Sequence, residues 1–118
     1  MQRALRNRLA YITSLRRDGG SERRARTRII EVFESPDRPE PLVKINPLAN
    51  WTKRDLWKFI HDNAIPTHPL WVKGYKSIGC APCTAPVGEG GNERDGRWGG
   101  SKDECGIHTA QEPLDFSI

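Results

Sequence analysis

The stretch that decides the fold is Leu42-Val-Lys-Ile-Asn-Pro-Leu-Ala-Asn-Trp-Thr-Lys-Arg-Asp55, which reads as a strand, a turn and the start of a helix. Residues 42–45 form an apolar run typical of a short strand, and Asn46-Pro47 ends it. Thr52 is a favourable helix N-cap, and Asp55 stands three residues later as its capping-box partner. The pattern predicts a strand followed closely by a helix.

That helix is predicted to run from about residue 53 to residue 62. Leu56, Trp57 and Ile60 fall on one face at helical spacing, which gives the helix an apolar side. Asn63 suits the left-handed conformation that closes many helices, and Pro66 prevents continuation. A short strand combined with an amphipathic helix favours an α/β fold.

A second short strand is predicted upstream, at residues 10–15. Arg16, Arg17 and Asp18 follow it, at the sheet edge where α/β proteins bind ligands, and Gly19-Gly20 then breaks the chain. Residues 21–34 are ambiguous between a short helix and a loop that leads into a strand. The prolines of residues 35–41 indicate a loop.

Composition limits the chain to one domain with a thin core. Of its 118 residues, 36% are hydrophobic and 29% charged, with 11 Gly and 9 Pro, so we expect a loop-rich chain that is helped by a metal, a partner or a further segment. The net charge is +4; residues 1–30 hold nine Arg and two acidic residues (+7), which leaves −3 for the remainder. This asymmetry favours an anionic partner, although a solvated basic face gives the same pattern.

The compartment is predicted to be the cytoplasm. The N-terminus lacks the apolar region of a signal peptide, and no apolar run approaches the roughly 18 residues of a membrane span. Three cysteines are an odd number, which argues against a secreted disulfide framework. We therefore expect reduced thiols and no membrane partner.

The cysteines concentrate the candidate chemistry between residues 75 and 108. Cys80 and Cys83 form a Cys-x-x-Cys unit, whose sulfurs can bind one metal ion or iron–sulfur cluster, or form a redox disulfide. Cys105 and His108 add a Cys-x-x-His unit, so the four residues together have an acceptable zinc-site spacing.

A glycine-rich loop between the two units carries Arg94 and Arg97. Guanidinium groups can hold phosphate or sulfate oxygens in bidentate fashion, whereas a solvated loop is the simpler interpretation. The glycines would also place Cys105 on a mobile arm, which suits a nucleophile that visits first a substrate and then a reductant.

Several segments, in the right order and spanning residues 3 to 108, resemble the assimilatory adenylyl-sulfate reductases, which belong with the phosphoadenylyl-sulfate (PAPS) reductases. The resemblance implies the C-terminal part of an adenine-nucleotide-hydrolase-like, three-layer α/β fold. The segments are Leu15-Arg-Arg-Asp18, Val43-Lys-Ile-Asn-Pro-Leu-Ala-Asn-Trp51-Thr, Gly74-Tyr-Lys-Ser-Ile-Gly-Cys80-Ala-Pro-Cys83-Thr, Arg94-x-x-Arg97-Trp98 and Glu104-Cys-Gly-Ile-His108.

The same resemblance implies a role for each site residue. Cys105 corresponds to a nucleophile that attacks the sulfur of adenylyl sulfate, releases AMP and becomes an S-sulfocysteine, which thioredoxin or glutaredoxin reduces to give sulfite. The residues implied to face substrate are Arg94, Arg97, His108 and one of Arg16 and Arg17.

Cys80 and Cys83 correspond to two of the four ligands of a [4Fe–4S] cluster. Relatives specific for 3′-phosphoadenylyl sulfate usually lack this pair, so its presence favours adenylyl sulfate as substrate. The family's phosphate loop, Ser-Gly-Gly-x-Asp-Ser, and its adjacent Cys-Cys pair have no counterpart in this sequence, and Gly19-Gly20 replaces the family's Gln-Ser.

We therefore expect one partial domain with three regions: residues 1–74 in the reductase sheet and helices, 75–108 with the cluster thiols and the Cys105 arm, and a tail at 109–118. Activity would require a separate N-terminal half or a homo-oligomer. The alternative is a non-catalytic module that binds nucleic acid or protein and holds zinc through Cys80, Cys83, Cys105 and His108.

Overall fold

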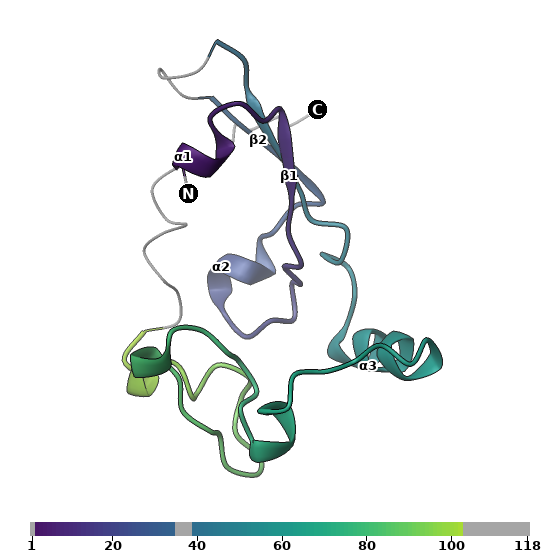
Figure 1. Ribbon diagram of the computed structural model, residues 1–118, viewed down its shortest axis with the longest axis vertical. Coiled ribbons are helices and arrows are strands. Elements are labelled where there is room, and N and C mark those ends of the chain that lie inside the picture. The colour runs from purple at the N-terminus through teal and green to yellow at the C-terminus, as the bar shows by residue number, and fades with distance from the viewer. Residues whose placement is uncertain (1, 35–38, 103–118) are drawn as a thin grey trace.

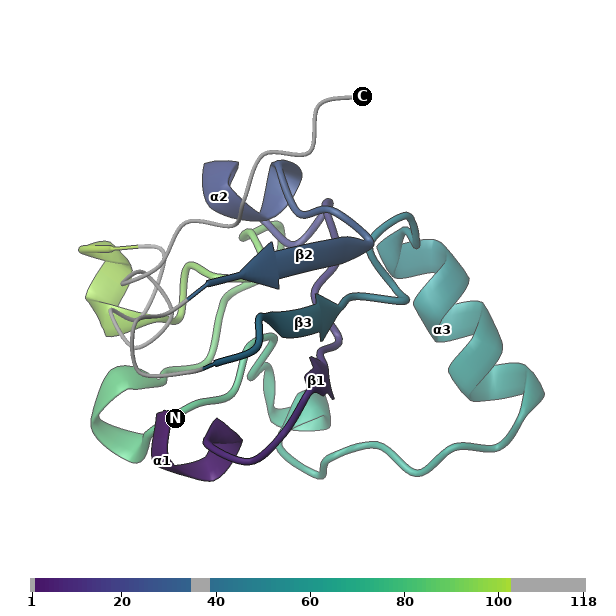
Figure 2. The same cartoon turned by 90° about the horizontal axis from the view of Figure 1, so that it is seen from above.

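Three short strands form one mixed sheet in the computed structural model, which describes residues 2–34 and 39–102. The central strand β3 runs parallel to β1 and antiparallel to β2 (Figure 2). The strands are β1 (Ala10–Ile12), β2 (Ile30–Phe33) and β3 (Leu42–Ile45). This small sheet with helices and long loops confirms the predicted α/β fragment.

Short helices and long loops make up the rest of the described chain. In Figure 1 the strands lie in the upper part of the molecule, whereas α3 and the loops of residues 70–102 lie below. The α-helices are α1 (Gln2–Leu5), α2 (Glu22–Ala25) and α3 (Lys53–Asp62), and the 3-10 helices are η1 (Trp71–Lys73), η2 (Ala81–Cys83) and η3 (Trp98–Gly100).

The strand–turn–helix prediction is confirmed at both elements. β3 covers residues 42–45 and α3 covers residues 53–62, with the Thr52–Asp55 capping box in place. The predicted left-handed conformation of Asn63 is wrong: Asn63 has φ −107°, and the positive φ falls on Ala64 at 50°. Asn63 instead closes the helix through its side-chain amide, which donates to the carbonyl of Phe59 at 2.9 Å.

The two upstream predictions need adjustment. The strand predicted at residues 10–15 ends at Ile12; the next residue, Thr13, still donates its backbone N–H to Ile45, and its side chain bonds with Asn46. The ambiguous residues 21–34 contain both alternatives, a one-turn helix (α2) and a third strand (β2).

Asn46, the residue that ends β3, joins all three strands. It is fully buried, its side-chain oxygen accepts from the Thr13 hydroxyl, and its amide donates to the carbonyl of Arg28 at 2.7 Å. Its backbone N–H donates to the carbonyl of Ile29, also at 2.7 Å. One buried polar side chain therefore fixes how β1 leaves the sheet and how β2 enters it.

The buried interior of the described residues is small and mostly polar. Within residues 2–34 and 39–102, the buried apolar side chains are those of Phe33, Leu42 and Ala49. Across β2 and β3, Glu31 and Lys44 are register partners and form a buried ion pair. The thin core predicted from composition is thus observed, with charged groups in places where a self-sufficient domain would have aliphatic ones.

Candidate active site

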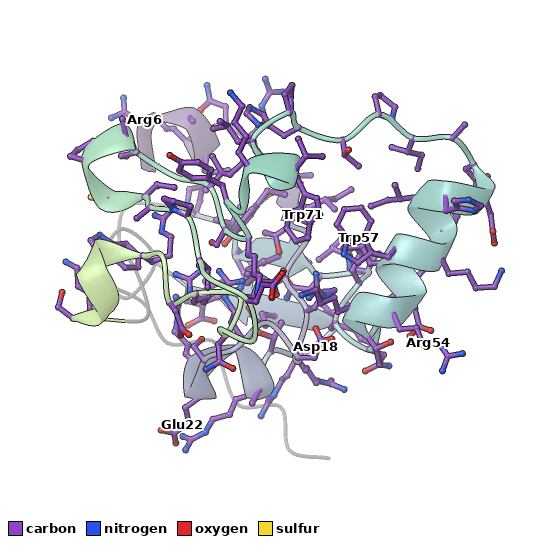
Figure 3. All side chains as sticks on the ribbon, turned by 90° about the horizontal axis from the view of Figure 1, so that it is seen from below. Arg6, Asp18, Glu22, Arg54, Trp57 and Trp71 are labelled. Atoms are coloured by element: carbon purple, nitrogen blue, oxygen red, sulfur yellow. The ribbon has the colours of Figure 1, made fainter. Side chains whose placement is uncertain are left out.

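The Arg-Arg-Asp segment after β1 links three parts of the molecule. Arg16 is buried, and its guanidinium bonds to Asp18 at 2.7 Å and to Glu93 at 3.1 Å. Asp18, near the centre of Figure 3, also accepts from the backbone N–H of Lys53 at the start of α3. The segment therefore joins the sheet to α3 and to the loop that carries Arg94.

Arg17 lies on the surface of the same turn. Its Nε donates to the carbonyl of Thr27 at 2.8 Å, and its Nη1 donates to the side chain of Asn50. Arg16 and Arg17, one of which is predicted to face substrate, thus each hold protein groups in place.

Arg94 and Arg97 converge on one aromatic ring. Their guanidinium carbons lie 5.6 Å and 4.6 Å from the ring centroid of Trp98, and Nζ of Lys102 lies 5.4 Å from it. Both arginines are buried. Trp98 has a positive φ of 48°, a conformation that costs a non-glycine residue free energy and is enriched at functional sites. Three cations around one ring repel each other, and an anionic ligand would offset that repulsion.

Arg97 also lies against the Cys80–Cys83 turn. Its Nη1 donates to the hydroxyl of Thr84 at 3.1 Å, and this hydroxyl donates to the carbonyl of Cys80 at 2.9 Å. A Cβ at Gly79 would stand 1.9 Å from Nη1 of Arg97, so only glycine leaves room for the guanidinium. Nε of Arg97 is buried with no hydrogen-bond partner among the described residues.

The Gly19-Gly20 turn provides a second close approach of arginines. A Cβ at Gly19 would stand 3.0 Å from Cδ of Arg24, and one at Gly20 would stand 3.8 Å from Cγ of Arg94. Gly20 also has φ +82°. Gly19 thus leaves room for the Arg24 side chain of α2, and the positive φ of Gly20 favours glycine at that position.

Cys80 is the N-cap of the single 3-10 turn η2, and Cys83 is its last residue. Both are free thiols, Cys80 exposed and Cys83 half-buried, and the N–H of Cys83 donates to the carbonyl of Cys80 at 2.9 Å. Soft thiolates two residues apart suit one iron of a cluster or a zinc ion. Within residues 2–34 and 39–102 no group of three or more His, Cys, Asp or Glu side chains could hold a metal, so the pair would need further ligands.

Cys105 and His108 lie outside the described residues. The structure therefore brings together Arg94, Arg97 and the Cys80–Cys83 turn, and it connects Arg16 to them through Glu93. The nucleophile and its histidine stay sequence predictions.

The family follows from comparison with known proteins. Residues 1–86 match the family model for the phosphoadenosine phosphosulfate reductase domain. The chain belongs to this family. Curated relatives of this reductase family named adenosine 5′-phosphosulfate reductase are 43% identical over 109 residues; they come from Bacillus thuringiensis (strain Al Hakam), Bacillus mycoides (strain KBAB4) and Bacillus cereus (strain 03BB102).

This chain of the reductase family is much shorter than those relatives. The match covers 92% of this chain but only 44% of each relative, so the chain spans less than half of their length. Among the residues that the structure describes, no helix is long and apolar enough to cross a membrane.

Sequence analysis missed three participants in the site. Glu93 bonds to Arg16 from 77 residues away, Thr84 holds Arg97, and Arg24 packs on Gly19. The glycine at position 79 was the available signal for the second contact, because a glycine directly before the Cys80–Cys83 turn can mark a close approach of another side chain. Glu93, the partner of Arg16, is distant in sequence and left no local signal.

Proposed function

We propose that this chain is the C-terminal portion of an adenylyl-sulfate reductase, which carries the sulfur-accepting thiol, the sulfate-binding arginines and half of the ligands of an iron–sulfur cluster. One observation carries the proposal: Arg94 and Arg97 meet at Trp98 directly beside the Cys80–Cys83 turn. The family match and the names of the relatives support the same reading.

In the proposed reaction the thiolate of Cys105 attacks the sulfur of adenylyl sulfate. The bond between that sulfur and the bridging oxygen breaks, AMP leaves with the electron pair, and Cys105 becomes an S-sulfocysteine. Arg94 and Arg97 neutralise the charge that builds on the sulfate and leaving-group oxygens. Nε of Arg97, which has no hydrogen-bond partner in the described part of the chain, would donate to such an oxygen. The same positive charge favours the thiolate form of Cys105.

The second half of the reaction regenerates the thiol. One thiol of thioredoxin or glutaredoxin attacks Sγ of Cys105, sulfite leaves, and the second thiol of the reductant resolves the mixed disulfide. The product of the two steps is one sulfite, one AMP and one oxidised reductant for each adenylyl sulfate. Because Cys105 must stay reduced between turnovers, the proposal assigns the protein to the cytoplasm.

The iron–sulfur cofactor is part of the proposal. Cys80 and Cys83 would hold one side of a [4Fe–4S] cluster, since both thiols are free and lie on one turn. The remaining two ligands would come from the part of the reductase that this chain does not span. When bound, the cluster would add a charged group next to Thr84 and Arg97, which hold the same turn.

The test uses this chain co-expressed with the non-matching part of the Bacillus cereus relative. After incubation with adenylyl sulfate and no reductant, mass spectrometry should find one sulfonate on the peptide that holds Cys105. Arg97→Ala should slow formation of this adduct by about 100-fold or more, because it removes a group aimed at developing charge. Arg54→Ala is the matched control, because Arg54 lies exposed on α3 and points away from the molecule (Figure 3).

Metal analysis separates the proposal from its alternative. Iron with acid-labile sulfide in the assembled protein supports the reductase. Stoichiometric zinc without sulfide, together with a Cys105 that alkylates only after a chelator is added, would support the zinc-binding module instead.

A further inference from the structure

The loop that carries Arg94 and Arg97 is rich in glycine. Its glycines between residues 88 and 100 are Gly88, Gly90, Gly91, Gly96, Gly99 and Gly100. Glycine loses more backbone freedom on folding than any other residue, so a loop of this composition is costly to order. Side-chain contacts to the rest of the protein are therefore needed to hold the two arginines in one place.

Glu93 fastens this loop to the turn that follows β1. Its Oε2 accepts from Nη2 of Arg16 at 3.1 Å, and the two side chains are only 22% and 10% exposed. A charge-assisted hydrogen bond shielded from water in this way is stronger than one on the surface. The next residue, Arg94, passes beside the same turn, where a Cβ at Gly20 would stand 3.8 Å from its Cγ. Two consecutive residues of the loop thus contact the segment of residues 16–20.

Arg16 is itself held in place from the other side. Its Nε donates to Oδ1 of Asp18 at 2.7 Å, and the second carboxylate oxygen of Asp18 accepts from the backbone N–H of Lys53 at the start of α3. Asp18 lies near the centre of the molecule in Figure 3. Because the carboxylates of Asp18 and Glu93 offset the single positive charge of Arg16, this arginine is better suited to joining protein segments than to binding a sulfate.

We propose that Glu93 is a positioning residue, which through its bond to Arg16 holds Arg94 where the sulfate of the substrate is bound. This role rests on the proposed function, since it is a role in that same site. Glu93 does not touch the substrate. Without its bond to Arg16 the glycine-rich loop would adopt many conformations, and only a fraction of the molecules would have Arg94 in place. The apparent affinity for the substrate falls by that fraction.

The competing explanation is that Glu93 only offsets the buried charge of Arg16. Its loss would then weaken the protein in general, without acting on Arg94 in particular. The two explanations differ in one measurable quantity. If Glu93 acts through Arg94, the effect of removing Glu93 on substrate affinity disappears once Arg94 is gone, whereas a general weakening of the protein is felt with or without Arg94.

The test measures the affinity for adenylyl sulfate by calorimetry. It uses the chain co-expressed with the non-matching part of the Bacillus cereus relative. Glu93→Ala should weaken binding about tenfold, because one charge-assisted hydrogen bond is lost. Glu93→Gln should weaken it only about threefold, because the amide oxygen can still accept from Arg16. Glu89→Ala is the matched control; Glu89 is an exposed acidic residue of the same loop, and its change should alter the affinity less than about twofold.

A double-mutant cycle decides between the two explanations. In an Arg94→Ala background, Glu93→Ala should change the affinity less than about twofold, since no Arg94 is left to be positioned. A loss of about tenfold in both backgrounds overturns the proposal, and so do equal effects of Glu93→Ala and Glu89→Ala. If Glu93→Ala fails to fold, the cycle is measured with Glu93→Gln, whose threefold effect should vanish in the same background.

The proposed function and the positioning role can fail separately. An assembled protein that binds adenylyl sulfate and releases sulfite, but binds it equally well with Glu93→Ala, overturns the positioning role alone. An assembled protein that binds no adenylyl sulfate overturns the proposed function. The same cycle is then measured on the chain with inorganic sulfate by NMR titration. A loss of affinity that depends on Arg94 supports the positioning role, whereas no sulfate binding or no loss overturns it as well.

Discussion

Replacing Asn46 with alanine should destabilise the protein, because it removes a buried polar side chain that links the three strands. The side chain is fully buried, and it serves the carbonyl of Arg28 and the hydroxyl of Thr13. Leaving the carbonyl unsatisfied costs about 1–3 kcal/mol, and losing the bond to the half-exposed hydroxyl costs about 1 kcal/mol. The expected loss is about 2–4 kcal/mol, out of the roughly 5–15 kcal/mol typical of a folded domain.

Urea unfolding followed by tryptophan fluorescence measures this loss. With a slope of about 2 kcal/mol per molar urea, within the usual range of about 1–3, Asn46→Ala should lower the midpoint by about 1–2 M. Asn63→Ala is the control, because its one side-chain bond, to the carbonyl of Phe59, is exposed, and it should cost less than about 1 kcal/mol.

A double-mutant cycle isolates the Asn46–Thr13 bond. Combining Asn46→Ala with Thr13→Val should destabilise by about 0.5–1.5 kcal/mol less than the sum of the two single changes, since the second change removes a group already left without its partner. Strict additivity, or a loss for Asn46→Ala no larger than for Asn63→Ala, would refute the view that Asn46 joins the three strands.

Two further predictions test the helix cap at Thr52 and the packing of Arg97 against Gly79. The pKa of Asp55 lies below its ordinary value, first because the Thr52 hydroxyl and then because the Thr52 backbone N–H donates to the carboxylate. A depressed folded-state pKa gives stability that is complete above the unfolded pKa and is lost as pH falls through the folded value. The cap should therefore start to weaken as the pH falls below about 4. NMR titration should show that Thr52→Ala raises the Asp55 pKa, and an unchanged pKa would contradict the capping role. Gly79→Ala should displace the Arg97 guanidinium and weaken binding of adenylyl sulfate to the assembled protein about tenfold by calorimetry, since one charge-assisted hydrogen bond is lost. Gly88→Ala should leave the binding of adenylyl sulfate unchanged, because a Cβ there meets no atom within 4 Å. Equal effects of the two changes would contradict the role of the Gly79–Arg97 contact.

Local rules determined what the sequence could predict of the fold. β3 and α3 were predicted with their observed bounds because the apolar run, the Thr52–Asp55 cap and the helical spacing act over a few residues. β2 stayed ambiguous because its Glu31 breaks the apolar pattern, and only the pairing with Lys44 across the sheet explains a buried carboxylate there. That partner is 13 residues away and on another strand.

For the candidate site, too, local features could be predicted from the sequence and long-range contacts could not. The motif positions of Arg94 and Arg97 could be predicted, and so could the Cys80–Cys83 turn. Their arrangement could not, because it depends on contacts such as Thr84 with Arg97 and Glu93 with Arg16 that join separate loops. The sequence also did not show that one face of the sheet carries only aliphatic side chains, because this follows only from the register that pairs residues of the three strands.

The most direct test of the account is sulfite release by the assembled protein. The chain, joined by the non-matching part of a relative and supplied with adenylyl sulfate and reduced thioredoxin, should release sulfite and AMP in equal amounts, and Cys105→Ser should abolish both. An assembled protein that contains its iron–sulfur cluster, binds adenylyl sulfate and still releases no sulfite, or that releases it equally well with Cys105→Ser, would contradict the central claim.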